Sequence, residues 1–208
     1  MARAKNTLLK GVSGKIGDIV TFERNGTQVV REHVIPKDPK TPAQLAQRMK
    51  LEVVNKGLSP LKNIIKRGHI GDSKAYRSSI GIAMKDCILG EYPKLSLDYS
   101  MIQLAQGKLQ LPENISISSD EKTNTIYISW DRELAFRDKP GKHDDNINVV
   151  YFNERHSMAK TLLNAPSRIK GELSFTLPKE WEIADTHFWI YLTSYDFLHN
   201  SDSLYLKI

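Results

Sequence analysis

The sequence contains a single cysteine, Cys87, among its 208 residues. One cysteine cannot form an internal disulfide, and zinc sites built from CxxC pairs are excluded as well. No run of about 18 apolar residues occurs, so the sequence predicts no membrane-spanning helix. The basic segment Met1–Asn6 is followed by only Leu8 and Leu9 before Lys10, which is too short an apolar stretch for a secretory signal. We therefore expect a cytoplasmic protein.

The composition is that of a folded chain with an uneven charge distribution. Hydrophobic residues make up 40% of the sequence and charged residues 26%, which excludes wholesale disorder. The net charge is +6, with +10 in residues 1–110 and −4 in residues 111–208. Such asymmetry indicates either a half that faces a polyanion or acidic partner, or helices whose lysine faces are simply solvated.

Residues 1–35 predict a basic arm followed by a β-hairpin. Residues 16–22 and 27–31 have the composition of two strands, and Asn25-Gly26 between them is a typical two-residue turn in which both positions need a positive φ. An isolated hairpin is only marginally stable in water. We expect the helices, the C-terminal half or another copy of the chain to cover it.

Three amphipathic helices are predicted after a polar connector at residues 36–40. The first begins with Thr41 as N-cap and Pro42 in the first helical position, and it ends near Gly57. Residues 59–68 repeat this cap chemistry in a second, shorter helix, and a third helix begins at Ser73. Each apolar stripe needs a packing partner. The opposite faces carry most of the excess basic residues.

The remaining sequence predicts a β-rich half. Two short strands are expected at residues 101–105 and 108–111, and Pro112 marks a domain boundary. Beyond it, six or seven short strands separated by polar turns are typical of a two-sheet sandwich. The sequence therefore predicts an α+β protein with a hairpin-plus-helices domain at residues 1–112 and an all-β, immunoglobulin-like sandwich at residues 113–208. The expected strands include residues 125–130, 147–152, 172–177, 186–195 and 203–208.

Two resemblances accompany this prediction. Segments 126–131, 149–152, 187–191 and 201–206 resemble strands of a fibronectin type III or related immunoglobulin-like sandwich. A second resemblance rests on short segments spread over nearly the whole chain. They are Gly14–Gly17, Val29–Arg31, Lys40–Gln44 with Gln47-Arg48, Leu58–Pro60, Asp98–Ser100 and Ser201–Tyr205. Through them the chain is similar to an uncharacterised family of Bacteroides-type bacteria known only as a domain of unknown function. That resemblance implies no activity and no site residue.

The glycine run at Gly11, Gly14 and Gly17 does not fit a phosphate-binding loop. A P-loop and a dinucleotide fingerprint both require a different glycine spacing that opens a helix, whereas a strand follows here. We interpret these glycines as positions of close backbone approach between strands.

Candidate catalytic and metal-ligating residues are few. His143, Asp144 and Asp145 form the one cluster that resembles metal ligands, but its polar surroundings indicate a solvated loop. His187 follows Asp185 without any nucleophile motif, and we interpret it as a sandwich-surface histidine. Cys87 lies on the apolar side of the third helix as a buried structural thiol. We predict no cofactor and no enzyme; a hydrolase that uses His187 or His143 is the weakest alternative.

Two hypotheses about function remain. The first is a non-catalytic assembly or protein-interaction protein, such as a structural component of a phage or mobile element, that binds itself or another protein by strand addition. The second is a cytoplasmic nucleic-acid-binding protein that contacts phosphates through its basic helices. No small-molecule substrate and no membrane partner are expected. The basic residues of the second hypothesis are Arg48, Lys62, Lys66, Arg67 and Arg77.

Overall fold

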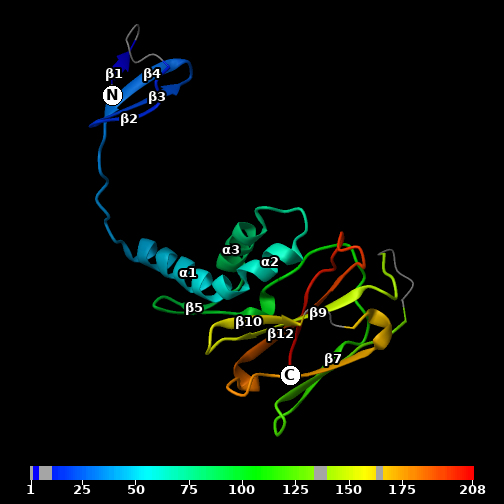
Figure 1. The fold of residues 1–208 in the computed structure, drawn as a ribbon. Coiled ribbons are helices and arrows are strands. Elements are labelled where there is room, and N and C mark those ends of the chain that lie inside the picture. Colours follow the sequence, from blue (N-terminus) through cyan, green and yellow to red (C-terminus); the bar gives the residue numbers. More distant parts are fainter. Residues whose placement is uncertain (1, 5–10, 134–139, 163–165) are drawn as a thin grey trace. The chain divides into compact units, whose positions relative to one another are not determined.

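A computed structural model describes residues 2–4, 11–133, 140–162 and 166–208 (Figure 1). The chain divides into two compact units, residues 1–41 and residues 42–208. Strands form the first unit, and helices followed by antiparallel sheets form the second. The predicted α+β class is confirmed. Among the described helices, none combines the length and apolar character needed to cross a bilayer.

The N-terminal unit is a small antiparallel sheet. Its strand order is β1-β4-β3-β2. The predicted turn between β3 and β4 is confirmed, with φ of 50° at Asn25 and 73° at Gly26. Residues 5–10 of the predicted basic arm lie outside the described residues, and β1 is a strand that the sequence did not predict. The strands are β1 (Ala2–Ala4), β2 (Gly14–Ile16), β3 (Ile19–Arg24) and β4 (Thr27–Glu32).

The C-terminal unit begins with the predicted helices. The first starts at Pro42, where the absent N–H of proline costs nothing in the first turn. Leu58, Leu61 and Ile65 are buried along the inner face of the helical layer. A short hairpin, β5 (Ile88–Glu91) with β6 (Lys94–Leu97), follows it. The helical elements are α1 (Pro42–Leu58), η1 (Ser59–Leu61), α2 (Lys62–Gly68), α3 (Ala75–Asp86) and η2 (Tyr99–Met101).

Two antiparallel sheets complete this unit as a sandwich. One sheet has the order β11-β8-β7 and the other the order β10-β9-β12-β13. The larger sheet lies between the smaller sheet and the helices, so the unit has three layers (Figure 1). The strands are β7 (Ser116–Asp120), β8 (Thr125–Ser129), β9 (Asn146–Asn153), β10 (Met158–Leu162), β11 (Glu172–Thr176), β12 (Thr186–Thr193) and β13 (Leu204–Leu206). Single helical turns are η3 (Arg168–Lys170) and η4 (Ile183–Asp185).

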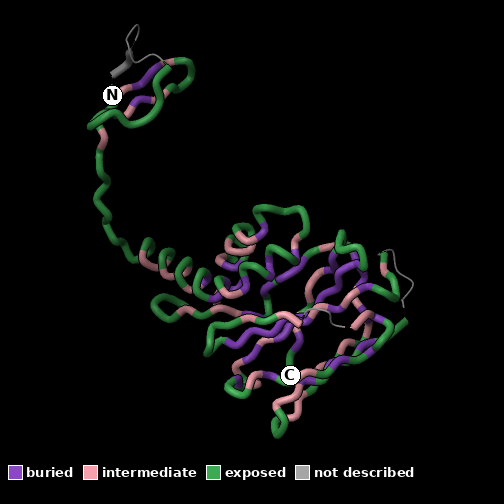
Figure 2. The backbone as a smooth tube through the Cα atoms, viewed as in Figure 1, coloured by how far each residue is buried: buried purple, intermediate pink, exposed green. Residues whose placement is uncertain are grey.

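The central sheet is buried on both faces, as Figure 2 shows for β9 and β12. Val150 and Trp189 point into the apolar cluster shared with the helices, whereas Val149 and Ile190 point into the cluster between the two sheets. Successive side chains of a strand alternate between faces. Double burial therefore explains why residues 149–152 and 188–192, in the middle of these strands, are continuously apolar rather than alternating.

The compact units divide after Thr41, whereas the sequence predicts a domain boundary after Pro112. The reason is the shared cluster, in which Leu58 and Ile65 of the helical layer pack with Phe152 and Trp189 of the central sheet. The helices therefore find their packing partner in the sandwich.

Residues 101–111 correct a second prediction. The strands expected at 101–105 and 108–111 are absent, although Leu104 and Ala105 are fully buried. Their backbone N–H groups donate to the Ser203 hydroxyl, and the N–H of Gln106 donates to the carbonyl of Gly68. These partners satisfy the backbone, so no ladder between the two segments is needed. Strand β10 was not predicted.

Candidate interaction surfaces

The tip of the β2–β3 hairpin presents two apolar side chains beside a carboxylate. Gly17 and Asp18 form the two-residue turn between Ile16 and Ile19, and the φ of 58° at Gly17 is the positive value that a type II′ turn needs at its first position. Ile16 is 50% exposed and Ile19 44% exposed. Asp18 is exposed between them. The tip is therefore a small protrusion with one negative charge and an apolar flank.

The interior of the N-terminal unit is small and partly polar. Its described buried residues are Thr21, Gln28 and Val29. The Thr21 hydroxyl and the Gln28 amide both donate to the backbone carbonyl of Val12 at 2.8 Å. The N–H of Gly11 donates to the Gln28 side-chain oxygen at 3.1 Å. Hydrogen bonds to the backbone of residues 11–12 thus hold the sheet together where a larger unit would have an apolar core.

A cavity of about 430 Å³ opens on the C-terminal unit between the end of α2 and the central sheet. Arg67 lines it together with Ile70, Tyr191 and Phe197. Ile70 is 46% exposed and Phe197 69% exposed, so two apolar lining residues of the cavity are open to solvent. The volume lies in the range of about 300–1,000 Å³ that binding pockets occupy.

Buried polar groups fix the walls of this cavity. The Asn200 amide donates to the backbone carbonyls of Arg67 at 3.1 Å and Gly68 at 2.8 Å, and it accepts from the Thr193 hydroxyl at 2.8 Å. These bonds tie the carboxyl end of α2 to strand β12. Burial raises the pKa of Tyr191, and the nearby positive charge of Arg67 offsets part of that increase.

The loop after β12 holds Phe197 in an unusual backbone conformation. Its φ is 59°, a left-handed value that is rare for a large side chain. The Asp196 carboxylate stabilises this turn because it accepts from the Ser194 hydroxyl and from the backbone N–H of Leu198. These two hydrogen bonds also lower the pKa of Asp196. The loop keeps a bulky aromatic side chain in solvent at the rim of the cavity.

His187 is half-buried, which corrects the prediction of a surface histidine. Its ring lies 4.4 Å from the Tyr99 ring, and its Nδ1 lies 2.9 Å from the Tyr205 hydroxyl. Burial lowers the pKa of His187, and the Glu154 carboxylate, 3.8 Å from Nε2, raises it in part. Burial raises the pKa of Tyr99 to about 12. The helical layer reaches the central sheet at this point, and these rings fill the junction.

The other candidate residues occupy ordinary positions. Cys87 is buried as predicted, and burial together with the Asp86 and Asp98 carboxylates raises the pKa of its thiol. His143 and Asp144 are exposed, whereas Asp145 is buried. The Asp145 carboxylate accepts from the backbone N–H of Lys142. Within the described parts of the chain, no three His, Cys, Asp or Glu side chains gather as they would around a metal ion.

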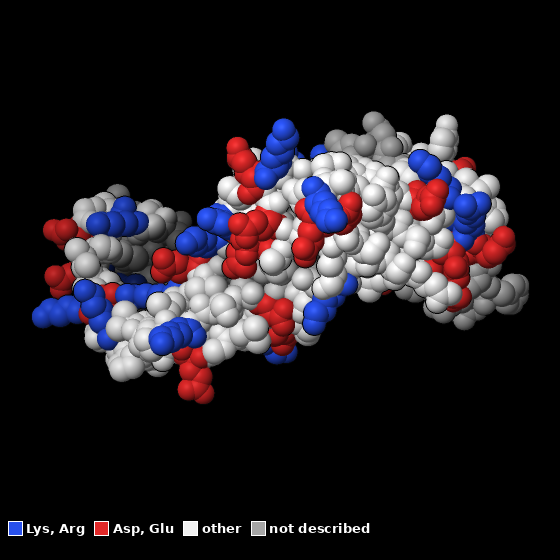
Figure 3. Space-filling model, turned by 90° about the horizontal axis from the view of Figure 1, so that it is seen from below, with Lys and Arg blue, Asp and Glu red and all other residues white. Residues whose placement is uncertain are grey.

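The five basic residues of the nucleic-acid hypothesis are all exposed on the helices. The Lys62 ammonium lies over the Tyr76 ring at 5.6 Å, whereas Arg67 lines the cavity at the sheet. On the face drawn in Figure 3, basic and acidic side chains are interspersed rather than gathered by sign. Nucleic-acid binding stays a prediction. The other three basic residues of this hypothesis are Arg48, Lys66 and Arg77.

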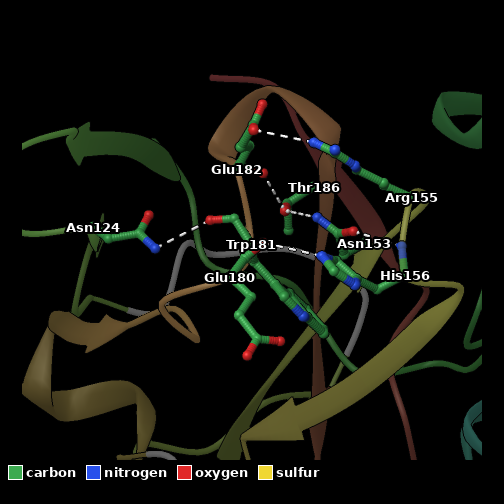
Figure 4. A network of polar contacts seen from close by, with 8 residues as sticks. All are labelled: Asn124, Asn153, Arg155, His156, Glu180, Trp181, Glu182 and Thr186. Carbon is green, nitrogen blue, oxygen red and sulfur yellow. Dashed lines mark hydrogen bonds and ion pairs between the residues drawn. The ribbon is translucent and has the colours of Figure 1, made fainter.

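A polar network at one end of the sandwich has a bracing role (Figure 4). The Asn153 amide donates to the Thr186 hydroxyl at 3.0 Å, and that hydroxyl donates to the Glu182 carbonyl. His156 stacks on Trp181, with 6.5 Å between the ring centroids. These contacts join the β9–β10 turn to η4.

A family comparison covers both units. A model of a family of unknown function, DUF6266, matches residues 11–207. The chain belongs to the DUF6266 family. No curated protein matches the chain. Because the match begins at Gly11, the hairpin that carries Ile16 and Ile19 is part of the DUF6266 family region together with the sandwich.

Sequence reasoning missed most of the cavity in this DUF6266 chain. Arg67 was named, but as a phosphate contact, and neither Tyr191 nor Phe197 was singled out. One local signal was present, because Tyr195, Phe197 and Leu198 form an apolar group in an otherwise polar loop. All three side chains are more than three-fifths exposed in the structure.

Proposed function

We propose that the chain is a non-catalytic assembly protein whose N-terminal sheet is completed by contact with a second copy. One observation carries this proposal. The described part of residues 1–41 buries only Thr21, Gln28 and Val29, whereas Ile16 and Ile19 are about half exposed. Val34 and Ile35, in the segment that leads to α1, are 68% and 80% exposed as well.

The size of the unit supports the same conclusion. Chains near 40 residues usually need disulfides, metals or oligomerisation for a stable fold. Residues 1–41 contain no cysteine and one histidine, His33, so disulfides and the usual zinc ligand sets are excluded by the sequence. We propose that association with a second copy stabilises this unit.

Among the described strands, β2 lies at one edge of the sheet and could accept an added strand. It pairs with β3 and ends the sheet. In a hairpin with a two-residue turn, the flanking residues Ile16 and Ile19 exchange hydrogen bonds, so the next pair, Lys15 with Val20, does not. The backbone N–H and C=O of Lys15 therefore point away from β3, where an added strand could bond them.

We also propose that the sandwich is an immunoglobulin-like adaptor. The first, second and fifth of its strands form one sheet and the other four form the second, which supports a likeness to fibronectin type III domains. A role in the cytoplasm of a Bacteroides-type bacterium, as a phage or mobile-element component, is consistent with this plan. It rests on analogy between modules.

Light scattering of the full chain tests the assembly proposal. We expect a mass above the 23.7 kDa of one copy for the wild-type protein and a shift towards one copy for the double variant Ile16→Asp, Ile19→Asp. Two buried charges at an apolar contact are strongly unfavourable. The matched control is Ile169→Asp, because Ile169 is 58% exposed on the other unit.

Two results would refute the proposal. One is a wild-type mass of one copy at every concentration up to the millimolar range. The other is an assembly that tolerates both substitutions in the hairpin. A fold check by circular dichroism accompanies each variant, so that loss of assembly is not confused with unfolding.

A further inference from the structure

We propose that the β2–β3 turn of one copy inserts into the Arg67 cavity of a second copy. This inference rests on the proposed function and specifies the contact through which assembly occurs. The inserted segment is Ile16–Ile19, and the group that it delivers to the cavity is the Asp18 carboxylate. The contact is intermolecular.

Charge complementarity supports the pairing. Asp18 is exposed at the tip of the turn, and Arg67 lines the cavity together with Tyr191, whose pKa its positive charge lowers in part. A guanidinium binds a carboxylate through two parallel hydrogen bonds and tolerates partial burial better than an ammonium does.

The apolar parts of the two surfaces match as well. On the turn, Ile16 and Ile19 flank the carboxylate and are about half exposed. At the cavity, Ile70 and Phe197 are lining residues beside Arg67 and are exposed to a similar or greater extent. Aromatic side chains and arginines that lose their contact with water on binding are typical of the centre of a protein interface.

The sizes are compatible. The cavity of about 430 Å³ is large enough for a few side chains but not for a whole strand. A two-residue turn is the narrowest end of a sheet, and here the turn itself carries only Gly17 and Asp18. The geometry therefore favours insertion of the tip rather than burial of the sheet face.

The contact is heterologous, because turn and cavity are different surfaces of the chain. Each copy then offers one turn and one cavity. Repetition of such a contact gives a ring where the rotation closes and a filament where it does not. A self-complementary dimer is not the expected product.

Charge reversal tests the pairing in the full-length chain. We expect Asp18→Arg and Arg67→Asp each to weaken self-association at least tenfold, which is about 1.4 kcal/mol. Mixed in equal amounts, the two variants should associate again, because opposite charges then face each other at every contact. The double variant Asp18→Arg, Arg67→Asp should likewise recover on its own. Glu121→Arg, at an exposed turn of the sandwich, is the control and should change little.

Milder variants guard against a folding artefact. Arg67 lies in the last turn of α2, where an aspartate opposes the helix dipole. Arg67→Gln and Asp18→Asn remove the charges without this effect and should weaken association in the same direction. A cysteine pair, Asp18→Cys with Ile70→Cys, should give disulfide-linked multimers under mild oxidation.

Each outcome has one meaning. If the wild-type chain assembles but neither reversal weakens it, or if mixing fails to restore association, this contact is wrong while the assembly proposal stands. Disulfide-linked single chains would overturn the intermolecular placement. If the wild-type chain is a single copy at every concentration, both proposals fail.

Discussion

Substitution of Gly68 by alanine is expected to destabilise the C-terminal unit. Gly68 ends α2 and lies against residues 104–105. An added Cβ would lie 2.2 Å from the carbonyl oxygen of Leu104 and 2.8 Å from the Cα of Ala105. Both neighbours are backbone atoms, so the segment must move by roughly 1 Å, and overpacking of this kind costs about 1–3 kcal/mol.

Gly81→Ala is the matched control for this substitution. Gly81 is a solvent-exposed residue in the middle of α3, and an added Cβ there meets nothing within 4 Å. Alanine is favoured over glycine in such a helix by about 1 kcal/mol. For a unit of this size, about 1 kcal/mol changes Tm by about 2–4 °C. We expect Gly68→Ala to lower Tm and Gly81→Ala to raise it.

Urea titrations followed by far-UV circular dichroism and tryptophan fluorescence measure the free energy of unfolding of both variants. Trp189 is a suitable reporter, because it lies between the helices and the central sheet and its indole N–H donates to the Ile102 carbonyl. If Gly68→Ala and Gly81→Ala raised the free energy of unfolding equally, the close contact between α2 and residues 104–105 would be refuted.

Two further predictions concern the histidine and the basic helices. Because burial lowers the pKa of His187, the unfolded chain binds a proton there more readily than the folded chain, and stability should fall as the pH drops below about 6.5. Thermal unfolding between about pH 5 and 8 should show this slope in the wild type and a flatter one in His187→Gln; an unchanged slope contradicts the assignment. If the basic helices contact phosphates, a low-salt gel shift should weaken with a log–log salt slope of about −4 to −5. The nucleic-acid hypothesis is wrong if no gel shift occurs at low salt. It is also wrong if the shift is unchanged when all five basic residues are replaced by glutamine. Those positions are Arg48, Lys62, Lys66, Arg67 and Arg77.

Local signals predicted much of the fold. Asn25-Gly26 adopts the two positive φ values that its composition implied, and Pro42 begins α1 as expected. The predicted strands from residue 125 onward begin within a residue or so of β8, β9, β11, β12 and β13. Turn chemistry, cap chemistry and alternation depend on neighbours in the chain, which is why they can be recognised without a structure.

Long-range packing could not be predicted in the same way. The docking of the helices on the central sheet joins residues such as Ile65 and Trp189, which no local pattern connects. One clue existed, because the continuous apolar run of β9 indicates a strand buried on both faces. The weakly alternating residues of β10, Met158–Leu162, gave no comparable signal. His187 was misplaced for the same reason, since Tyr99 reaches it from the helical layer.

The candidate site was only partly visible in the sequence. Arg67 and Asn200 are joined by a hydrogen bond although 133 positions separate them. The cavity therefore depends on a contact between distant segments. The turn at Gly17-Asp18 was within reach of sequence reasoning, but the strand predicted for residues 16–22 ran across it.

Hydrogen exchange measured against protein concentration tests the central claim most directly. If the N-terminal sheet is completed by a second copy, amides of residues 14–32 should exchange quickly in dilute solution and become protected as concentration rises. Amides of the central sheet, in β9 and β12, should stay protected throughout. Protection of residues 14–32 that is strong and independent of concentration would contradict the claim, because the sheet would then be stable within one chain.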